Sequence, residues 1–326
     1  MVNINAKIIN LLLCSIEIGN AYSSLFSSLK NNSYLKKLDI SNNGILHDGI
    51  KSLCLGLTEN IDSGFSSYVY NVFSSNNTSN AYANKSVIES LNLSYNILTN
   101  ESAEYISDLF TKKKSLLNIQ LNDCGLSNYG ISVISKTSKS IQSLDFSLNK
   151  ITENGLEIVG KYYLDNTNTS KFMQRETKEL YLSMKILTFK SDLNCVSFLK
   201  YLSTGNLCKI SLSNNSIADT GFILLIKSII DSVSLSSVNF SLNNITTEGI
   251  KSLVLFMQAE SFNKCGLTDL KLSNNYVNDE GFELLSKTKI NKNLSVDLTY
   301  NKIKALFQYV IDFNENTKTL YSIKLI

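Results

Sequence analysis

Short hydrophobic runs recur along the chain, and the spacing of their apolar residues changes partway through each run. Residues 267–281 read LTDLKLSNNYVNDEG, in which leucines alternate with polar residues before a polar bridge ends at a glycine. The next residues, FELLSKT, have the i, i+3, i+4 spacing of an amphipathic helix. Because strict alternation is typical of a half-buried strand, the stretch predicts a short strand, a bridge and a helix.

The same unit is repeated through the whole sequence. Its template is L-x-x-L-x-L-x-x-N-x-L, whose letters are numbered here as positions one to eleven. Position six falls at residues 13, 40, 93, 121, 146, 182, 212, 240, 272, 298 and 325, a period of roughly 28 residues. One strand and one helix cannot bury their own apolar faces, so neighbouring units must stack. The pattern therefore predicts a single domain over residues 1–326, built from about eleven stacked repeats.

Two spacings are longer than the rest. The interval from 40 to 93 contains residues 62–86, which are rich in Ser and Asn and poor in aliphatic residues. This composition favours an insertion loop, with a degenerate repeat built on Phe65, Tyr68 and Tyr70 as the alternative. A smaller insertion is expected at 163–176. Residues 1–30 are expected to form an N-terminal capping repeat and residues 302–326 a C-terminal cap.

The repeated template closely resembles the leucine-rich repeat family, and in its length the ribonuclease-inhibitor-like subclass. It is also distantly similar to the repeat domains of Ran GTPase-activating proteins. The resemblance implies an α/β solenoid shaped as a horseshoe, with parallel strands on the concave face and helices on the convex face.

Position nine is occupied by asparagine in most repeats. A side-chain amide both donates and accepts, so it can satisfy backbone groups where the chain turns out of a strand. We therefore expect a structural ladder of Asn43, Asn96, Asn149, Asn215, Asn243, Asn275 and Asn301. Cys124 takes this position in one repeat, a substitution that the family tolerates. Lys185 takes it in another, and because a buried ammonium is costly we expect that repeat to be distorted, with the lysine reaching solvent.

The polar bridge of each repeat supplies residues suited to start a helix. Thr152, Thr246 and Asp279 stand shortly before the recurring glycine. Side-chain oxygens of Thr and Asp accept hydrogen bonds from the first free amides of a helix. We expect these residues to be helix N-caps and assign them no catalytic role.

Composition narrows the possible functions. The 326 residues carry 31 basic and 28 acidic side chains, a formal charge of +3, and Arg175 is the only arginine. Because nucleic-acid readers depend on arginine, no nucleic-acid partner is expected. No apolar run is long enough to span a bilayer, so no membrane partner is expected either. KIINLLLCSI near the start resembles the apolar part of a signal peptide. Because Asn10 and Glu17 interrupt that resemblance, we expect a cytoplasmic protein, with a signal peptide and a nuclear location left open.

Catalytic chemistry finds little support. His47 is the only histidine, and the six cysteines are dispersed without a C-x-x-C pair, so the usual zinc spacings are absent. The sequence contains no P-loop, G-x-S-x-G or H-E-x-x-H motif. We therefore predict a protein without catalytic residues, metal, cofactor or small-molecule substrate.

The positions that the template leaves free are the candidates for function. Positions two, three, five, seven and eight should face the concave surface, and most hold neutral polar residues. Large apolar side chains stand there at Tyr95, Leu148, Tyr181, Met184 and Leu242. Exposed apolar and aromatic groups are typical of interaction sites. We predict a protein or peptide partner at this patch and a non-catalytic scaffold or adaptor function.

An alternative function follows from the family resemblance. A regulator of a small Ran-like GTPase, of the GTPase-activating type, would have a repeat domain of comparable size. Those proteins carry a functionally important arginine in an early repeat, and the first three repeats here contain none.

Overall fold

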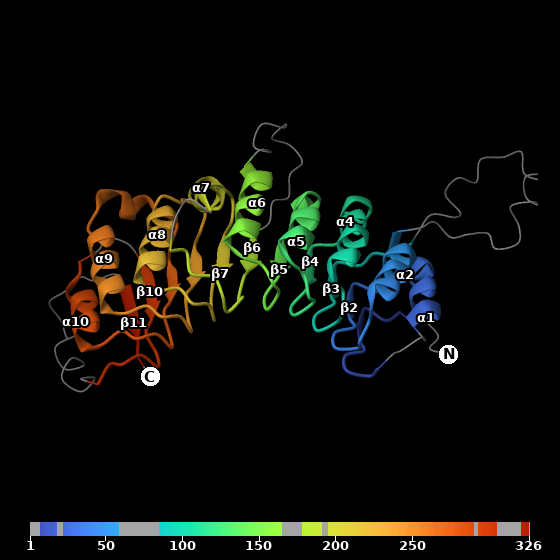
Figure 1. Cartoon of the computed structure of the whole chain (residues 1–326), viewed down its shortest axis with the longest axis horizontal. Coiled ribbons are helices and arrows are strands. Elements are labelled where there is room, and N and C mark those ends of the chain that lie inside the picture. Colours follow the sequence, from blue (N-terminus) through green and yellow to red (C-terminus); the bar gives the residue numbers. More distant parts are fainter. Residues whose placement is uncertain are drawn as a thin grey trace, which may run out of the picture.

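The strands of the molecule form one parallel sheet in sequence order. The computed structural model describes residues 7–17, 22–58, 85–164, 178–190, 195–289, 293–304 and 321–325. Within them lies an 11-stranded sheet ordered β1 to β11, and each strand pairs in parallel with the next. Figure 1 shows a curved ribbon with the helices along its outer side and the strands along its inner side. The predicted α/β solenoid of eleven repeats is confirmed.

The elements have the following bounds. The strands are β1 (Asn10–Leu12), β2 (Lys37–Asp39), β3 (Ser90–Asn92), β4 (Asn118–Gln120), β5 (Ser143–Asp145), β6 (Glu179–Tyr181), β7 (Lys209–Ser211), β8 (Ser237–Asn239), β9 (Asp269–Lys271), β10 (Leu294–Asp297) and β11 (Tyr321–Lys324). The α-helices are α1 (Tyr22–Ser28), α2 (His47–Thr58), α4 (Ala103–Lys112), α5 (Asn128–Ser135), α6 (Glu153–Leu164), α7 (Val196–Thr204), α8 (Asp219–Ile230), α9 (Thr247–Met257) and α10 (Asp279–Lys287). Short 3-10 helices lie at Leu29–Asn31, Asn100–Ser102, Ser138–Ser140 and Glu260–Lys264.

Below, each repeat takes the number of its strand. The register of the sheet keeps like positions side by side. Lys37 pairs with Ser90, and Ser90 in turn with Asn118, so position three of one repeat always meets position three of the next. Because no register shift accumulates, each template position forms a column that runs along the whole solenoid. Residues far apart in sequence thereby share one face, which decides where the functional residues meet.

The core lies between the sheet and the helices. Position-six side chains in repeats 2 to 10 are at most 1% exposed, from Ile40 to Leu298. Helix α9 buries Ile250, Leu253 and Met257 against this layer. Fully burying one such side chain contributes about 1.5–3 kcal/mol. The repeated columns therefore supply the stability that a single strand and helix lack.

The insertions fall mostly outside the described residues. Helix α6 continues to Leu164, so the first two residues of the insertion expected at 163–176 are helical. The rest of that segment, and residues 62–84 of the other expected insertion, lie outside the described residues. At the two ends of the sheet, β1 pairs only with β2 and β11 only with β10. Leu13 and Leu325, at position six of the end repeats, are only partly buried.

Candidate interaction surface

The position-nine asparagines are engaged with the backbone, and all of them are buried except Asn301, which is half-buried. Asn243 Nδ2 donates to the carbonyl oxygens of Leu212 and Phe240, both at 2.9 Å, and its Oδ1 accepts from the Ile217 amide at 3.1 Å. Each asparagine thus joins its own repeat to the preceding one. The same type of bonding is made by Asn43, Asn96, Asn149, Asn215, Asn275 and Asn301. Their side chains are occupied within the fold and offer little to a partner.

Repeat 6 departs from this arrangement. The Met184 amide donates to Asn215 Oδ1 at 3.1 Å, as the Cys124 amide donates to Asn149 Oδ1 at the same distance. Met184 therefore occupies the buried position that asparagine or cysteine holds elsewhere, and its side chain is only 4% exposed. Lys185 takes the left-handed turn conformation, with φ of 65°, and is exposed.

Two expectations are decided by this repeat. The expected distortion and the exposure of Lys185 are confirmed. The prediction that Met184 is exposed to a partner is wrong. In this repeat the buried turn position is taken by residue 184, one residue before the template's position nine. The apolar side chain of Met184 therefore fills it, and the ammonium group of Lys185 stays in water.

The Asp and Asn side chains at position five are also engaged. Asp39 Oδ1 accepts from the Ser41 amide at 2.9 Å, closing a turn two residues further on. The same bond is made by Asn92, Asp145, Asn239 and Asp297. These side chains lie on the concave face, but one oxygen of each already serves the fold.

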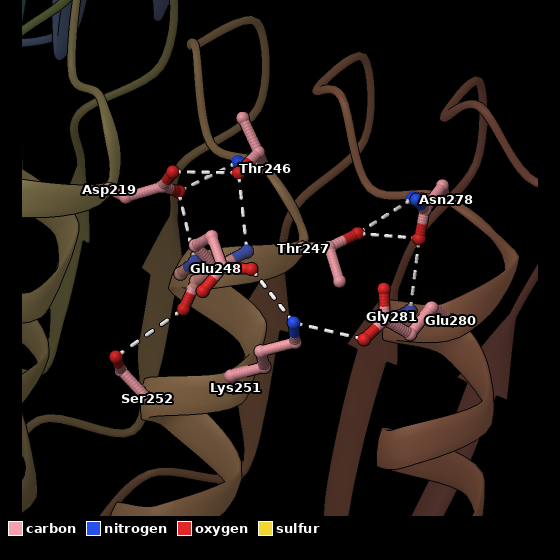
Figure 2. Close-up of polar contacts among 10 residues, drawn as sticks. Asp219, Thr246, Thr247, Glu248, Lys251, Ser252, Asn278, Glu280 and Gly281 are labelled. Atoms are coloured by element: carbon pink, nitrogen blue, oxygen red, sulfur yellow. Dashed lines mark hydrogen bonds and ion pairs between the residues drawn. The ribbon is translucent and has the colours of Figure 1, made fainter.

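In several repeats, a carboxylate or amide at the start of the helical segment reaches the following repeat. Asp219 Oδ1 accepts from the amides of Thr246, at 2.8 Å, and Gly249, at 3.0 Å (Figure 2). A Cβ on Gly249 would lie 2.6 Å from that oxygen. Asn100 makes the same pair of bonds to Ser127 and Gly130. The recurring glycine is therefore required by a close approach between repeats.

The three predicted helix caps have different outcomes. Thr152 Oγ1 accepts from Asn128 Nδ2 at 2.9 Å, and its role as the cap of α6 stays a prediction. Thr246 accepts from the Glu248 amide and caps α9 as expected. The cap of α10 is Asn278, whose Oδ1 accepts from the Gly281 amide at 3.2 Å (Figure 2). Asp279, predicted to be the cap, is instead the first helical residue, and its Oδ1 accepts from the Lys304 amide at 2.7 Å in the next repeat.

Tyr181 lies on the concave face in the middle of the sheet. Its hydroxyl donates to Glu179 Oε2 at 3.2 Å, and Lys209 Nζ lies 2.8 Å from Glu179 Oε1. The hydrogen bond from Lys209 lowers the pKa of Glu179, against the opposing effect of burial. Burial and the neighbouring Glu179 carboxylate raise the pKa of Tyr181. The tyrosine is thus half-buried, neutral and fixed in orientation by a charged neighbour.

The other predicted contact residues lie on a different part of the molecule. Tyr95, Leu148 and Leu242 stand at position eight, directly after their strands, with φ near 60°. Tyr95 is 50% and Leu242 51% exposed, and Leu148 is half-buried. We call the residues at positions eight, ten and twelve, where the chain passes from strand to helix, the loop edge. The structure therefore does not gather the predicted residues into one patch.

The loop edge holds exposed apolar residues that the sequence reasoning missed. They are Leu46, Ile97, Ile186, Tyr276 and Tyr300. Tyr300 stands at position eight, and the other four stand at positions ten and twelve, which the template also leaves free but which were not predicted to face a partner. An apolar residue at a position that the template leaves free is the sequence signal that identifies these exposed side chains.

The described part of the chain lacks two other kinds of site. It contains no group of three or more His, Cys, Asp or Glu side chains placed to hold a metal ion. None of its helices combines the length and the apolar character needed to cross a membrane.

Comparisons with known proteins agree with the repeat architecture. A family model for the leucine rich repeat matches residues 31–54, 137–157 and 231–254. NACHT, LRR and PYD domains-containing protein 12 of Mus musculus is 28% identical over 230 residues, which are 68% of this chain and 21% of that protein. The human NACHT, LRR and PYD domains-containing protein 5 (Homo sapiens) is 30% identical over 203 residues, covering 61% of this chain and 16% of that protein. The chain spans about a fifth of the length of these curated relatives.

Among solved structures, the TLR13–ssRNA13 complex aligns with a TM-score of 0.43 and 18% identity, over 87% of this chain and 34% of that one. The family match concerns the repeat itself, so the ribonuclease-inhibitor-like subclass stays a resemblance.

Proposed function

Because the chain is a leucine-rich repeat protein, we propose that it is a non-catalytic scaffold that binds a protein partner on its concave face. The observation that carries the proposal is Tyr181. In the position-five column of repeats 2 to 10, every other residue is Ser, Asn, Gln, Asp or Lys. A single large aromatic side chain in the middle of a polar, curved surface is the residue type that dominates interface hot spots.

The surroundings of Tyr181 support an interface role. Its hydrogen bond to Glu179 fixes the ring before a partner arrives, which lowers the entropy lost on binding. Lys209 and Glu179 form an ion pair beside it, at 2.8 Å. A polar rim around an aromatic anchor matches the anatomy of non-obligate interfaces. Tyr95, Leu148 and Leu242 are proposed as further contact residues along the loop edge, and Met184 is not among them.

The test compares two substitutions in the same column. Tyr181→Ser removes the aromatic anchor. Gln120→Ser changes an exposed residue of the same column, two strands away, whose side chain makes no hydrogen bond to the described residues. Both variants and the unchanged chain are used as bait in quantitative affinity purification. We expect a protein that is retained by the unchanged chain and by Gln120→Ser and is lost with Tyr181→Ser. Retention of every partner by Tyr181→Ser would refute the concave site.

The alternative function receives its own assay. A regulator of a small Ran-like GTPase would accelerate GTP hydrolysis when mixed with the purified GTPase. We expect no acceleration, because no arginine stands in the first three repeats. Acceleration would replace the scaffold proposal. Tight binding of single-stranded RNA would likewise correct the expectation of a protein partner alone.

A further inference from the structure

Position five of the concave face carries three aspartates that differ in what stands beside them. They are Asp39, Asp145 and Asp297. Asp39 Oδ2 accepts from Asn92 Nδ2 in the next strand at 2.9 Å. Asp297 pairs in register with Lys271 on one side and Lys324 on the other. Asp145 stands between Gln120 and Tyr181, so its register neighbours include no cation.

The carboxylate of Asp145 keeps one oxygen that the described fold does not use. Its Oδ1 accepts from the Ser147 amide at 2.9 Å, and no described residue bonds or forms an ion pair with its Oδ2. Because paired strands lie about 4.8 Å apart, this carboxylate stands directly beside Tyr181. After burial and the Glu179 carboxylate, Asp145 also helps to raise the pKa of Tyr181.

Positive charge lies on the other side of Tyr181. Lys209, on strand β7, is 2.8 Å from Glu179 and neutralises it. Lys178 Nζ donates to the carbonyl oxygen of Asn206 at 3.3 Å, toward the start of repeat 7. The cations are therefore drawn away from strand β5, which borders β6 on the opposite side (Figure 1).

The concave face on the β5 side of Tyr181 is acidic. Positions two, three, five, seven and eight of repeats 3 to 5 hold no lysine or arginine. Their acids are Glu89, Asp123 and Asp145. Glu89 is paired with Lys36 of repeat 2 at 2.8 Å. The other two carboxylates form no ion pair with a described residue, so this side of the surface favours a positively charged segment.

The ring of Tyr181 leans along its own strand. Residues two apart on one face of a strand are separated by about 6.6 Å. The Tyr181 hydroxyl nevertheless lies 3.2 Å from Glu179 Oε2, which an upright ring would not reach. A ring that leans over the sheet turns one face to the open concave side. The face of an aromatic ring attracts a cation placed above it.

We propose that a lysine or arginine side chain of the protein partner lies over the Tyr181 ring and bonds to Asp145. The inference rests on the proposed concave site and names the chemistry of the segment that this site takes, which is basic. A partner that covers Tyr181 also removes water from Asp145, and an unpaired charge without water is costly. A cationic donor supplies the missing hydrogen bond to Oδ2 and is attracted by the ring as well.

Segments of other chemistry fit this place less well. An acidic segment, or the phosphates of a nucleic acid, would bring negative charge against Asp145, while Lys209 is already held by Glu179. A purely apolar segment would cover the Tyr181 ring but would leave Asp145 without water or a donor. A basic segment is the one that gains contacts with both residues.

The test uses two matched substitutions in the position-five column. Asp145→Asn removes the charge and keeps the turn, because Asn92 and Asn239 make the same bond at this position. Asp297→Asn is the control. Asp297 is half-buried like Asp145, accepts from the Thr299 amide at 3.0 Å, and stands four strands away from Tyr181.

The probe is a phage-displayed library of random short peptides. Peptides that bind the Tyr181→Ser chain are discarded, and the remainder are selected on the unchanged full chain. We expect the selected peptides to be enriched in lysine or arginine and poor in acidic residues, compared with the unselected library. A representative peptide is then synthesised, and fluorescence anisotropy measures its dissociation constant with each variant.

Asp145→Asn should raise this dissociation constant about tenfold or more. Replacing the basic residue of the peptide by glutamine should weaken binding to the unchanged chain by a similar factor. The same replacement should hardly weaken binding to Asp145→Asn further, because each change removes one half of the same pair. Asp297→Asn should bind the peptide as the unchanged chain does.

Each other outcome overturns a stated part of the account. Selected peptides that need Tyr181 but contain no lysine or arginine overturn the inference and leave the concave site standing. Equal weakening by Asp145→Asn and Asp297→Asn indicates general charge attraction and overturns the pairing with Asp145. A library that yields no peptide dependent on Tyr181 overturns the concave site, and the inference with it. Circular dichroism of each variant shows whether the fold is kept.

Discussion

The Gly249 amide donates to Asp219 Oδ1 at 3.0 Å, which joins the first turn of helix α9 to the start of helix α8 in the preceding repeat. The contact is close because the glycine has no side chain, and a Cβ there would lie 2.6 Å from the same oxygen. A carboxylate and a glycine that lie 30 residues apart in the sequence thus form a joint between neighbouring repeats in the structure.

Gly249→Ala should destabilise the protein through this contact. The new methyl group forces Asp219 away and breaks its bonds to two amides, at a cost of about 1–3 kcal/mol. Urea unfolding followed by circular dichroism measures the change. If the clash is the cause, Asp219→Ala combined with Gly249→Ala should cost less than the two single changes together. Strict additivity would exclude the clash.

The ladder asparagines should be among the most sensitive positions. Asn243→Ala leaves the Ile217 amide without its acceptor in a buried turn. It also removes one of the two side-chain amide donors from each of the Leu212 and Phe240 carbonyl groups, and the total cost should be about 1–3 kcal/mol. Asn244 is next to it in sequence and is exposed, and its side chain makes no hydrogen bond to any residue that the structure describes. Asn244→Ala should therefore change stability by less than about 0.5 kcal/mol. Equal losses for the two variants in urea unfolding would contradict the ladder.

Glu153 should make part of the stability depend on pH. Burial opposes its ionisation, but hydrogen bonds from the amides of Thr188 and Phe189 and from the Thr188 hydroxyl outweigh burial and lower its pKa. A carboxyl group with a lowered folded-state pKa stabilises the fold above the pKa of the unfolded chain. That stability is lost as pH falls through the lower, folded-state pKa.

Glu153→Gln should therefore lower the free energy of unfolding at neutral pH and lose this effect in acid. The expected loss near neutrality is about 1–2 kcal/mol, the low end for charge-assisted bonds, because the group is partly exposed. Glu260→Gln, at an exposed carboxyl group, is the control. A loss for Glu153→Gln that stays the same across the acid range would rule out the ionised carboxylate as its source.

The cysteines should differ sharply in reactivity. Burial raises the pKa of the Cys124 thiol to about 12, whereas Cys14 is exposed. Since the thiolate is the reactive form, a thiol reagent near neutral pH should modify Cys14 quickly and Cys124 only on unfolding. Peptide mass spectrometry over time measures both. Rapid labelling of Cys124 in the folded chain would show that its turn opens.

The periodic part of the fold could be predicted from sequence because one set of requirements recurs in every repeat. Position six must be apolar, as at Ile40 and Leu298. Position nine must provide hydrogen bonds to the backbone groups of the turn, as Asn243 does. Local pattern and tertiary packing therefore agree, and the strands stack without a register shift.

The sequence pattern puts Met184, Tyr95 and Leu242 in the wrong place for two physical reasons. In repeat 6 the buried turn position is taken by Met184, one residue before the template's position nine. Counting residues by the template does not reveal this shift, and it therefore places Met184 on the surface. Position eight has a positive φ, so Tyr95 and Leu242 lie on the loop edge and not in the row of Tyr181. The contacts between Asp219 and Gly249 join different repeats, and residue spacing within a single repeat does not reveal them.

The central claim is that a protein partner binds the concave face around Tyr181. The most direct measurement places photo-reactive benzoylphenylalanine at Tyr181 in one chain and at Leu255, an exposed apolar residue on outer helix α9, in another. After irradiation in cell extract, mass spectrometry identifies what each chain captures. The account predicts a cross-linked protein from position 181 that is absent from position 255. The same protein captured from both positions, or from 255 alone, would contradict it.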